Sequence, residues 1–274
     1  MPHLAIDLGG TNVRVAVVSG GRILKYQSEP CLSAGRQEEV VQQIITLIES
    51  VLDETVDKIG IGVPSVVDYR RGIVYDVLNI PSWKEVHLKD LLEAHFHIET
   101  HVDNDVNCYA LGEKRFGGGK PFTDIVGITL GTGVGAGIIV GGNLYRGANT
   151  GAGEIGCLPY LDSDYEHYTS SMFFARRGVT GQKMADLAAT GDAEALDLWK
   201  QFGRHLGKLL QVILFTYDPE AIIIGGGIAS SAPFFEQSMR DSMRDGFPYQ
   251  HEVDNVHVLF SQLKDCNLLG ASEL

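Results

Sequence analysis

Residues 4–18 read LAIDLGGTNVRVAVV, and their pattern predicts two strands with a glycine-rich turn between them. A short apolar run at 4–6 is followed, after the turn, by valines at every second position of 13–17, as in a half-buried strand. The break, DLGGTN at 7–12, has neither the helix-opening glycine spacing of a dinucleotide fingerprint nor the Gly-Lys-Ser/Thr of a Walker loop. The stretch therefore predicts a β-hairpin.

The glycine turn of this hairpin has the composition of an anion-binding loop. Gly9 and Gly10 can adopt positive φ angles, which lets successive backbone N–H groups point at one phosphate. Because Asp7 would repel a bare phosphate, its presence suggests a divalent cation or a water beside the anion. A structural Gly-Gly turn capped by aspartate explains the same residues equally well, so this stretch alone leaves both interpretations open.

Composition and charge indicate a soluble globular protein of 274 residues, enough for one large domain or two modest ones. The formal net charge of -13 argues against a nucleic-acid-binding surface, but one bound nucleotide needs only local amides and cations. The four cysteines form no CxxC pair, and no secretory leader precedes the first strand, so we expect a reduced, cytoplasmic protein. Because no apolar run approaches the length of a membrane span, we expect no membrane partner.

The next hundred residues predict the order βββαβ, with the first two strands supplied by the hairpin. The periodicity predicts a third strand at 23–26, an amphipathic helix at 37–53, a buried strand at 58–63, an extra hairpin within 65–83, a helix at 88–96 and a strand at 98–102. Three strands followed by a helix and a parallel strand indicate half of a mixed-sheet nucleotide-binding domain rather than a Rossmann half.

A cluster of polar residues, DNDVN at 103–107, separates this last strand from a helix predicted at 106–116. An aspartate or asparagine at such a corner is an ordinary N-cap. With Asn104 and Asp105 adjacent, however, one side chain can hold the helix amides while the other faces a cleft, so capping explains only one of them. The run GGGKP at 117–121 then has the composition of a hinge or linker.

Beyond the linker the opening pattern returns. A strand at 125–130, a glycine turn at 131–135 and a strand at 136–140 repeat the first hairpin about a hundred residues later. Two such domains facing each other would place both turns on one ligand, so the repeat favours the phosphate interpretation. The rest of the chain predicts a long helix at 192–217 and a strand at 221–224 that runs into three glycines, with room for a base or ribose, and a short helix. A strand at 256–260 and a helical turn at 268–274 follow.

Eight motifs in this order resemble the ROK sugar kinases, relatives of bacterial glucokinase. They are DLGGTNVR (7–14), GVP (62–64), N-x-x-x-W (79–83), VDNDVNCYALGE (102–113), LGTGVGAGII (130–139), GAGEIG (151–156), YEHYTS (165–170) and DPEAIIIGGGI (218–228). The resemblance implies an α/β, two-domain actin-like ATPase (ribonuclease H-like) fold, with mixed sheets built from βββαβα units. We expect a small N-terminal domain at 1–116 and 260–274, and a large C-terminal domain at 117–259.

The resemblance also implies a reaction, which is ATP-dependent transfer of the γ-phosphoryl group to a sugar hydroxyl, the 6-hydroxyl of glucose or a related hexose. Asp105 matches the family's general base, a role that suits a carboxylate able to accept the hydroxyl proton. The implied site residues are Asp7, Gly9, Gly10, Thr11, Asn12, Thr132 and Gly133 for the phosphates, with Mg²⁺ near Asp7; Gly226 and Gly227 for adenosine; and Asn79, Asn104, Asp105, Glu154 and Glu166 for the sugar. The family further suggests a homodimer or homotetramer.

The sequence departs from the family pattern at two places. Cys157 stands where members commonly carry a histidine after GEIG, and the cysteine-rich zinc loop is missing between Leu158 and Glu166. Because four zinc ligands are then not available, we predict no zinc. The missing histidine leaves the sugar open, with N-acetylmannosamine, N-acetylglucosamine, allose, mannose and fructose as alternatives.

Two other kinds of protein are alternatives to a kinase. A sugar-responsive repressor of the same family needs an N-terminal helix-turn-helix, and the first hairpin begins too early in this chain to leave room for one. A non-catalytic sugar-sensing protein would fit the change at Cys157, whereas the presence of Asp105 argues against it.

Overall fold

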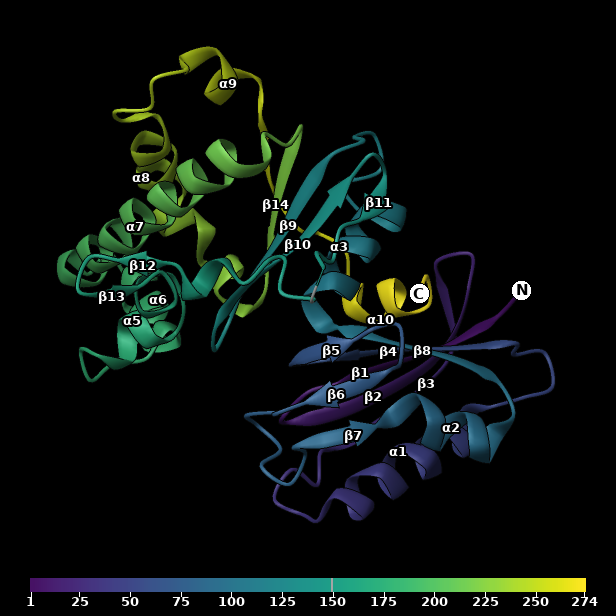
Figure 1. Ribbon diagram of the computed structural model, residues 1–274. Coiled ribbons are helices and arrows are strands. Elements are labelled where there is room, and N and C mark those ends of the chain that lie inside the picture. Colours follow the sequence, from purple (N-terminus) through teal and green to yellow (C-terminus); the bar gives the residue numbers. More distant parts are fainter. Residues whose placement is uncertain (149) are drawn as a thin grey trace.

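The computed structural model describes residues 1–148 and 150–274 (Figure 1), and most of the chain surrounds two five-stranded sheets. The first sheet has the order β3-β2-β1-β4-β8 and consists of β1 (His3–Leu8), β2 (Asn12–Ser19), β3 (Arg22–Pro30), β4 (Lys58–Val63) and β8 (Glu99–Asn104). The second has the order β11-β10-β9-β14-β15 and consists of β9 (Ile125–Leu130), β10 (Val134–Val140), β11 (Asn143–Leu144), β14 (Ala221–Gly225) and β15 (His257–Phe260).

The two sheets have the same topology. In each, three antiparallel strands form a meander, which is β1–β2–β3 in the first sheet and β9–β10–β11 in the second. The first strand of each meander pairs in parallel with a later strand, β4 or β14. That strand pairs in parallel with the last strand of its sheet, β8 or β15. The predicted hairpins at 4–18 and 125–140 are therefore confirmed, and they occupy equivalent places in the two sheets. The expected duplication and the expected mixed sheets are confirmed with them.

Helices fill the connections between the strands and cover the outer faces of the sheets. They are α1 (Gln37–Val51) and α2 (Leu88–Phe96) on the first sheet, and α6 (Gly181–Ala189), α7 (Ala193–Tyr217), α8 (Ala232–Arg244) and α9 (Gln250–Asn255) on the side of the second. Both cores are apolar, and the second is dominated by aromatic rings: Trp199 of α7 stacks on Phe235 of α8. Burial of such rings stabilises the layer that α7 and α8 form on the second sheet.

The short elements lie in the connections. The β4–α2 connection carries a separate three-stranded sheet of β5 (Val66–Asp68), β6 (Ile73–Tyr75) and β7 (Glu85–His87), and the stretch between β11 and α6 carries β12 (Pro159–Tyr160), β13 (Ser163–Asp164), the 3-10 turn η1 (Ile155–Cys157), α4 (Glu166–Thr169) and α5 (Met172–Ala175). A second 3-10 turn, η2 (Gly227–Ser231), follows β14.

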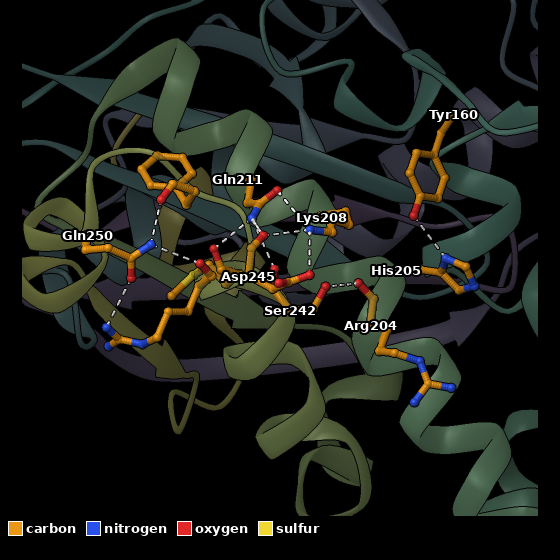
Figure 2. A network of polar contacts seen from close by, with 11 residues as sticks. Tyr160, Arg204, His205, Lys208, Gln211, Ser242, Asp245 and Gln250 are labelled. Atoms are coloured by element: carbon orange, nitrogen blue, oxygen red, sulfur yellow. Dashed lines mark hydrogen bonds and ion pairs between the residues drawn. The ribbon is translucent and has the colours of Figure 1, made fainter.

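Side chains of α7 also bind the C-terminal end of α8 (Figure 2). The Gln211 amide donates to the carbonyl oxygens of Ser242 at 3.1 Å and Asp245 at 2.8 Å, and the Lys208 ammonium donates to the Asp245 carbonyl at 2.9 Å. The last carbonyl groups of a helix have no partner within it, so these bonds satisfy acceptors that would otherwise be exposed to solvent. The polar cluster in Figure 2 is thus explained by the fold, and none of its labelled residues lines the large cavity described below.

Two helices pack against each other between the sheets, α3 (Asp105–Phe116) and α10 (Cys266–Ala271) (Figure 1). Their backbones approach so closely that a Cβ atom added at Gly112 would lie 2.3 Å from the Cys266 carbonyl oxygen. Each helix reaches across: α3 packs on β9 and β10 of the second sheet, and α10 packs on β1 and β4 of the first. The buried Glu113 of α3 accepts hydrogen bonds from the Gly118 amide at 2.9 Å and from the Ser261 hydroxyl. Gly118 follows α3 and Ser261 follows β15, so Glu113 holds both segments of the chain that pass between the sheets.

Several sequence-based boundaries need correction. The first helix ends at Val51 rather than residue 53, and β8 continues through Asn104, so the polar corner begins inside the strand. The predicted hairpin within 65–83 gains a third strand, β7. The short helix predicted after the three glycines is the longer α8, whose buried face is formed by a few widely spaced residues between charged ones. The division into domains at 1–116 with 260–274 and at 117–259 stays a prediction.

Candidate active site

A cavity of about 860 Å³ is lined by residues from both halves of the chain. The lining residues include Arg14 of β2, Asp105 at the start of α3, Thr129 of β9, Gly226 between β14 and η2, and Glu236 of α8. Cavities of this size hold nucleotides and other small ligands. The chain therefore brings the predicted base and the predicted adenosine glycine to the walls of one cavity.

Asp105 is the first residue of α3, and its neighbour Asn104 performs the capping. The Asn104 side-chain oxygen accepts hydrogen bonds from the amides of Val106 at 2.8 Å and Asn107 at 3.3 Å. The Asp105 carboxylate accepts one bond from the Val106 amide at 2.9 Å and lines the large cavity. As the adjacent pair Asn104–Asp105 predicts, one side chain caps the helix and the other faces a cavity.

The surroundings of Asp105 favour its protonated form. Burial, followed by the nearby negative charge of Asp7 and, more weakly, of Glu154, raises the pKa of Asp105 to about 7. Those two charges also show that Asp7 and Glu154 lie near Asp105, although they come from different halves of the chain. A carboxyl group with a pKa near neutrality is suited to accept a proton at ordinary pH.

Asp7 already has a cationic partner within the chain. Arg14 lies opposite Asp7 in the β1–β2 register, its Nε atom donates to the Asp7 carboxylate at 2.8 Å, and its Nη1 atom lies 3.4 Å from the Asp265 carboxylate. The sequence analysis missed this partner, although the pattern contained the signal: in a short hairpin, residues equally far from the turn face each other. The negative charge of Asp7 is thus partly balanced before any ligand arrives.

The glycine turns differ from the expected positive-φ geometry. The described residues with positive φ include neither Gly9 nor Gly10, so the proposed reason for these glycines is wrong. They provide space instead: a Cβ atom added at Gly10 would lie 2.4 Å from the Cβ atom of Asn79, and one added at Gly133 would lie 2.4 Å from the Glu166 carboxylate. In both turns a glycine allows a predicted sugar residue to approach the backbone.

The other residues predicted to bind phosphate lie at the tips of the turns. Thr11, Asn12 and Thr132 are exposed, and the Gly9 amide donates to the Asn12 carbonyl at 2.9 Å, which closes the first turn. Gly226 has a φ of 85°, and a Cβ atom there would lie 2.3 Å from the Leu130 carbonyl oxygen. Gly227 follows it at the start of η2 and is exposed.

Of the predicted sugar residues only Asp105 lines the large cavity, whereas Asn79, Asn104, Glu154 and Glu166 do not. Asn104 donates to the Ser65 carbonyl at 3.1 Å, and Glu166 accepts from the Val134 amide at 3.2 Å. Burial and the charge of Glu166 raise the pKa of Glu154, so these two carboxylates are neighbours. Asn79, on an exposed turn, lies against Gly10.

Cys157 lies beside these carboxylates. The residue as a whole is exposed, but its sulfur is partly buried. This partial burial, together with the charges of Glu154 and Glu166, raises the pKa of the thiol. Within residues 1–148 and 150–274, no three His, Cys, Asp or Glu side chains are grouped so that they could hold a metal ion. The absence of zinc stays a prediction. In the same described part of the chain, no helix is both long enough and apolar enough to cross a membrane.

The model of the ROK family matches residues 3–274. A glucokinase of Thermotoga maritima is 30% identical, over 100% of this chain and 98% of its own length. The crystal structure of a ROK family glucokinase from Streptomyces griseus, in complex with glucose and AMPPNP, is 28% identical and has a TM-score of 0.85 over 100% of this chain and 98% of that one.

A xylose repressor of Bacillus spizizenii is also similar, with 31% identity over 79% of this chain and 60% of its own length. The family thus includes regulators as well as kinases. The match with the glucokinase structure confirms the predicted actin-like ATPase fold. Since the family model covers nearly the whole sequence, the chain belongs to the ROK family.

Proposed function

We propose that this protein transfers the γ-phosphoryl group of ATP to a hydroxyl of a hexose, the 6-hydroxyl of glucose or a related sugar, with Asp105 as the general base. The relatives named glucokinase, which align over nearly their whole length, make it an ATP-dependent sugar kinase. The observation that carries the proposed mechanism is the place of Asp105, on a cavity wall shared by both halves and with a pKa of about 7.

Asp105 would act at the sugar hydroxyl. Its carboxylate accepts the hydroxyl proton while the oxygen bonds to the γ-phosphorus and the bond from that phosphorus to the bridging oxygen of ADP breaks. Deprotonated Asp105 is available in quantity only near or above its pKa of about 7. Asn104 caps α3 and thereby holds the backbone of the base in place.

The phosphates would lie between the two glycine turns. Gly9, Gly10, Thr11 and Asn12 on one side, with Thr132 and Gly133 on the other, offer backbone amides and hydroxyl groups as donors. Arg14, on the wall of the large cavity, adds a cation that sequence reasoning did not include. Gly226 and Gly227 leave the backbone open for adenosine.

The residues near the turns also fit Mg²⁺ that arrives with ATP. Magnesium in such sites is held by one or two carboxylates together with phosphate oxygens, so a three-residue protein cluster is not required. Asp7 is the carboxylate that would hold it. When bound, the ion neutralises charge on the transferred group.

The sugar would be held by Asn79, Asn104, Glu154 and Glu166, whose amides and carboxylates suit a polyol because each forms several directional hydrogen bonds. N-acetylmannosamine, N-acetylglucosamine, allose, mannose and fructose remain alternatives to glucose. We infer further that the protein works in the cytoplasm as a homodimer or homotetramer, without zinc, nucleic acid or membrane as a partner.

The test is a coupled assay of ADP release from the purified protein with Mg²⁺-ATP and each of these sugars. We expect one hexose to give sugar-dependent turnover well above the ATPase background. If every sugar leaves ADP release at background while calorimetry detects sugar binding, the protein is a non-catalytic sugar-sensing protein and the proposal is wrong.

A further inference from the structure

A largely buried ion pair joins the two halves of the chain beside the proposed sugar site. The Nε atom of Arg146 donates to the Asp103 carboxylate at 2.5 Å, and the two side chains are 24% and 3% exposed. Arg146 follows the last strand of the second meander, whereas Asp103 lies in β8 of the first sheet. The Arg146 guanidinium also lies 4.5 Å from the ring centre of Tyr69, a cation–π distance.

The other oxygen of Asp103 organises the corner that carries the base. It accepts hydrogen bonds from the backbone amide of Asn104 at 2.8 Å and from the side-chain amide of Asn107 at 2.8 Å. Asn104 in turn caps α3, whose first residue is Asp105. One carboxylate is therefore bonded at the same time to the corner of the first half and to an arginine of the second.

Arg146 also marks the start of the segment that leads to Glu154. Its carbonyl oxygen accepts a hydrogen bond from the Ala152 amide at 3.3 Å, and the carbonyl of Gly153 accepts one from the Ala136 amide of β10 at 3.0 Å. Glu154 is the next residue. Gly153 is thus bonded to the second sheet, and Arg146 is bonded to the first sheet through Asp103.

We infer that the Arg146–Asp103 pair is a positioning device that sets the separation between Glu154 and the Asn104–Asp105 corner, and that the affinity for the sugar depends on it. The inference rests on the proposed kinase function. Neither side chain is assigned a contact with the sugar. The pair acts because a largely buried charge that loses its partner is strongly unfavourable, so the two segments must rearrange when either member is removed.

Substitution of each partner tests the inference. We expect Arg146→Met and Asp103→Asn each to weaken sugar binding, measured as KM and as the calorimetric Kd without ATP, by about tenfold or more, because small misplacements of binding groups reduce affinity and rate steeply. KM for ATP should stay within about twofold. The double variant should be no worse than about either single one, since residues that act as a pair are not additive.

Arg70→Met is the matched control. Arg70 also lies over the Tyr69 ring, at 5.6 Å from its centre, but no ion pair joins it to Asp103. Its loss should leave both KM values unchanged. Arg146→Lys keeps the charge without the guanidinium, and we expect an intermediate loss of sugar affinity; it also serves if circular dichroism shows that Arg146→Met is unfolded.

The outcomes separate this inference from the proposed function. If the unsubstituted protein neither binds nor phosphorylates any sugar of the panel, the proposed function fails, and the inference fails with it. If the unsubstituted protein is an active sugar kinase and the Arg146 and Asp103 variants keep its sugar Kd, the inference alone is wrong. Equal weakening of sugar and ATP, or a lower melting temperature with unchanged affinities, would also overturn it, because that is the signature of a merely structural ion pair.

Discussion

In the β1–β2 hairpin Asp7 lies opposite Arg14, whereas at the equivalent place of the β9–β10 hairpin Thr129 lies opposite Gly135. The two hairpins share strand pairing, and each turn brings a glycine against a predicted sugar residue. Only the first hairpin places an ion pair beside Asp105. The duplicated backbone therefore supplies two similar turns, while the Asp7–Arg14 ion pair belongs to the first hairpin alone.

The helices that follow the two sheets repeat this difference. α3 begins with Asp105, capped by Asn104, whereas the equivalent helix α10 begins with the buried thiol of Cys266 and has no side-chain cap. Burial and the neighbouring carboxylate of Glu113 raise the pKa of that thiol far above its usual range. We therefore propose that proton transfer takes place at α3 and not at α10.

Removal of the base should have the largest effect. Asp105→Ala should reduce kcat by about 10²–10⁴-fold, the usual contribution of a general base, with sugar and ATP affinities retained. Asp90→Ala is the matched control, because Asp90 is an aspartate in the first turn of the neighbouring helix α2. Steady-state kinetics measures both. An Asp105→Ala enzyme with a near-normal kcat would reject the assignment.

The pH profile should reflect the same carboxyl group. Because the pKa of Asp105 is about 7 and the base must be deprotonated, kcat/KM should fall about tenfold for each pH unit below 7 and level off above it. The rate is measured between pH 5 and 9 with saturating Mg²⁺-ATP. A flat profile across pH 6 to 8 would contradict the raised pKa.

The two turns should respond differently to an added methyl group. In Gly10→Ala the methyl meets the Cβ atom of Asn79, which can move only with its backbone, so we expect the sugar KM to rise about tenfold. In Gly133→Ala it meets the end of the flexible Glu166 side chain, and a shifted rotamer at roughly 0.5 kcal/mol gives about a twofold rise. A larger effect at Gly133 would reverse this ranking of the hairpins.

The smallest effect concerns stability. A carboxyl group whose pKa is raised in the folded state stabilises least when it is ionised, so the unsubstituted protein loses stability as pH rises from about 4, the unfolded pKa, to about 7. Asp105→Asn removes this dependence. Its melting temperature should exceed that of the unsubstituted protein by more at pH 8 than at pH 5, as measured by calorimetry. The same difference at both values would mean that Asp105 is not perturbed.

Local patterns were enough to predict the two hairpins, the buried strand β4 and the long helix α7, because alternation and helical spacing are carried by neighbouring residues. The corner at Asn104 and Asp105 was also predictable, since capping depends on adjacent residues. The glycines were predicted for the wrong reason, because the space that Gly10 leaves for Asn79 depends on a contact across 69 positions. The Arg146–Asp103 pair was missed for the same reason: it exists only once the two sheets face each other.

The proposed kinase moves the γ-phosphoryl group from ATP to a sugar hydroxyl. ³¹P nuclear magnetic resonance of the purified protein with Mg²⁺-ATP and the best hexose of the panel follows that group directly. We predict a sugar 6-phosphate signal that grows in step with ADP and is nearly absent with Asp105→Ala. Growth of inorganic phosphate alone, or sugar phosphate at an equal rate in both proteins, would contradict the account.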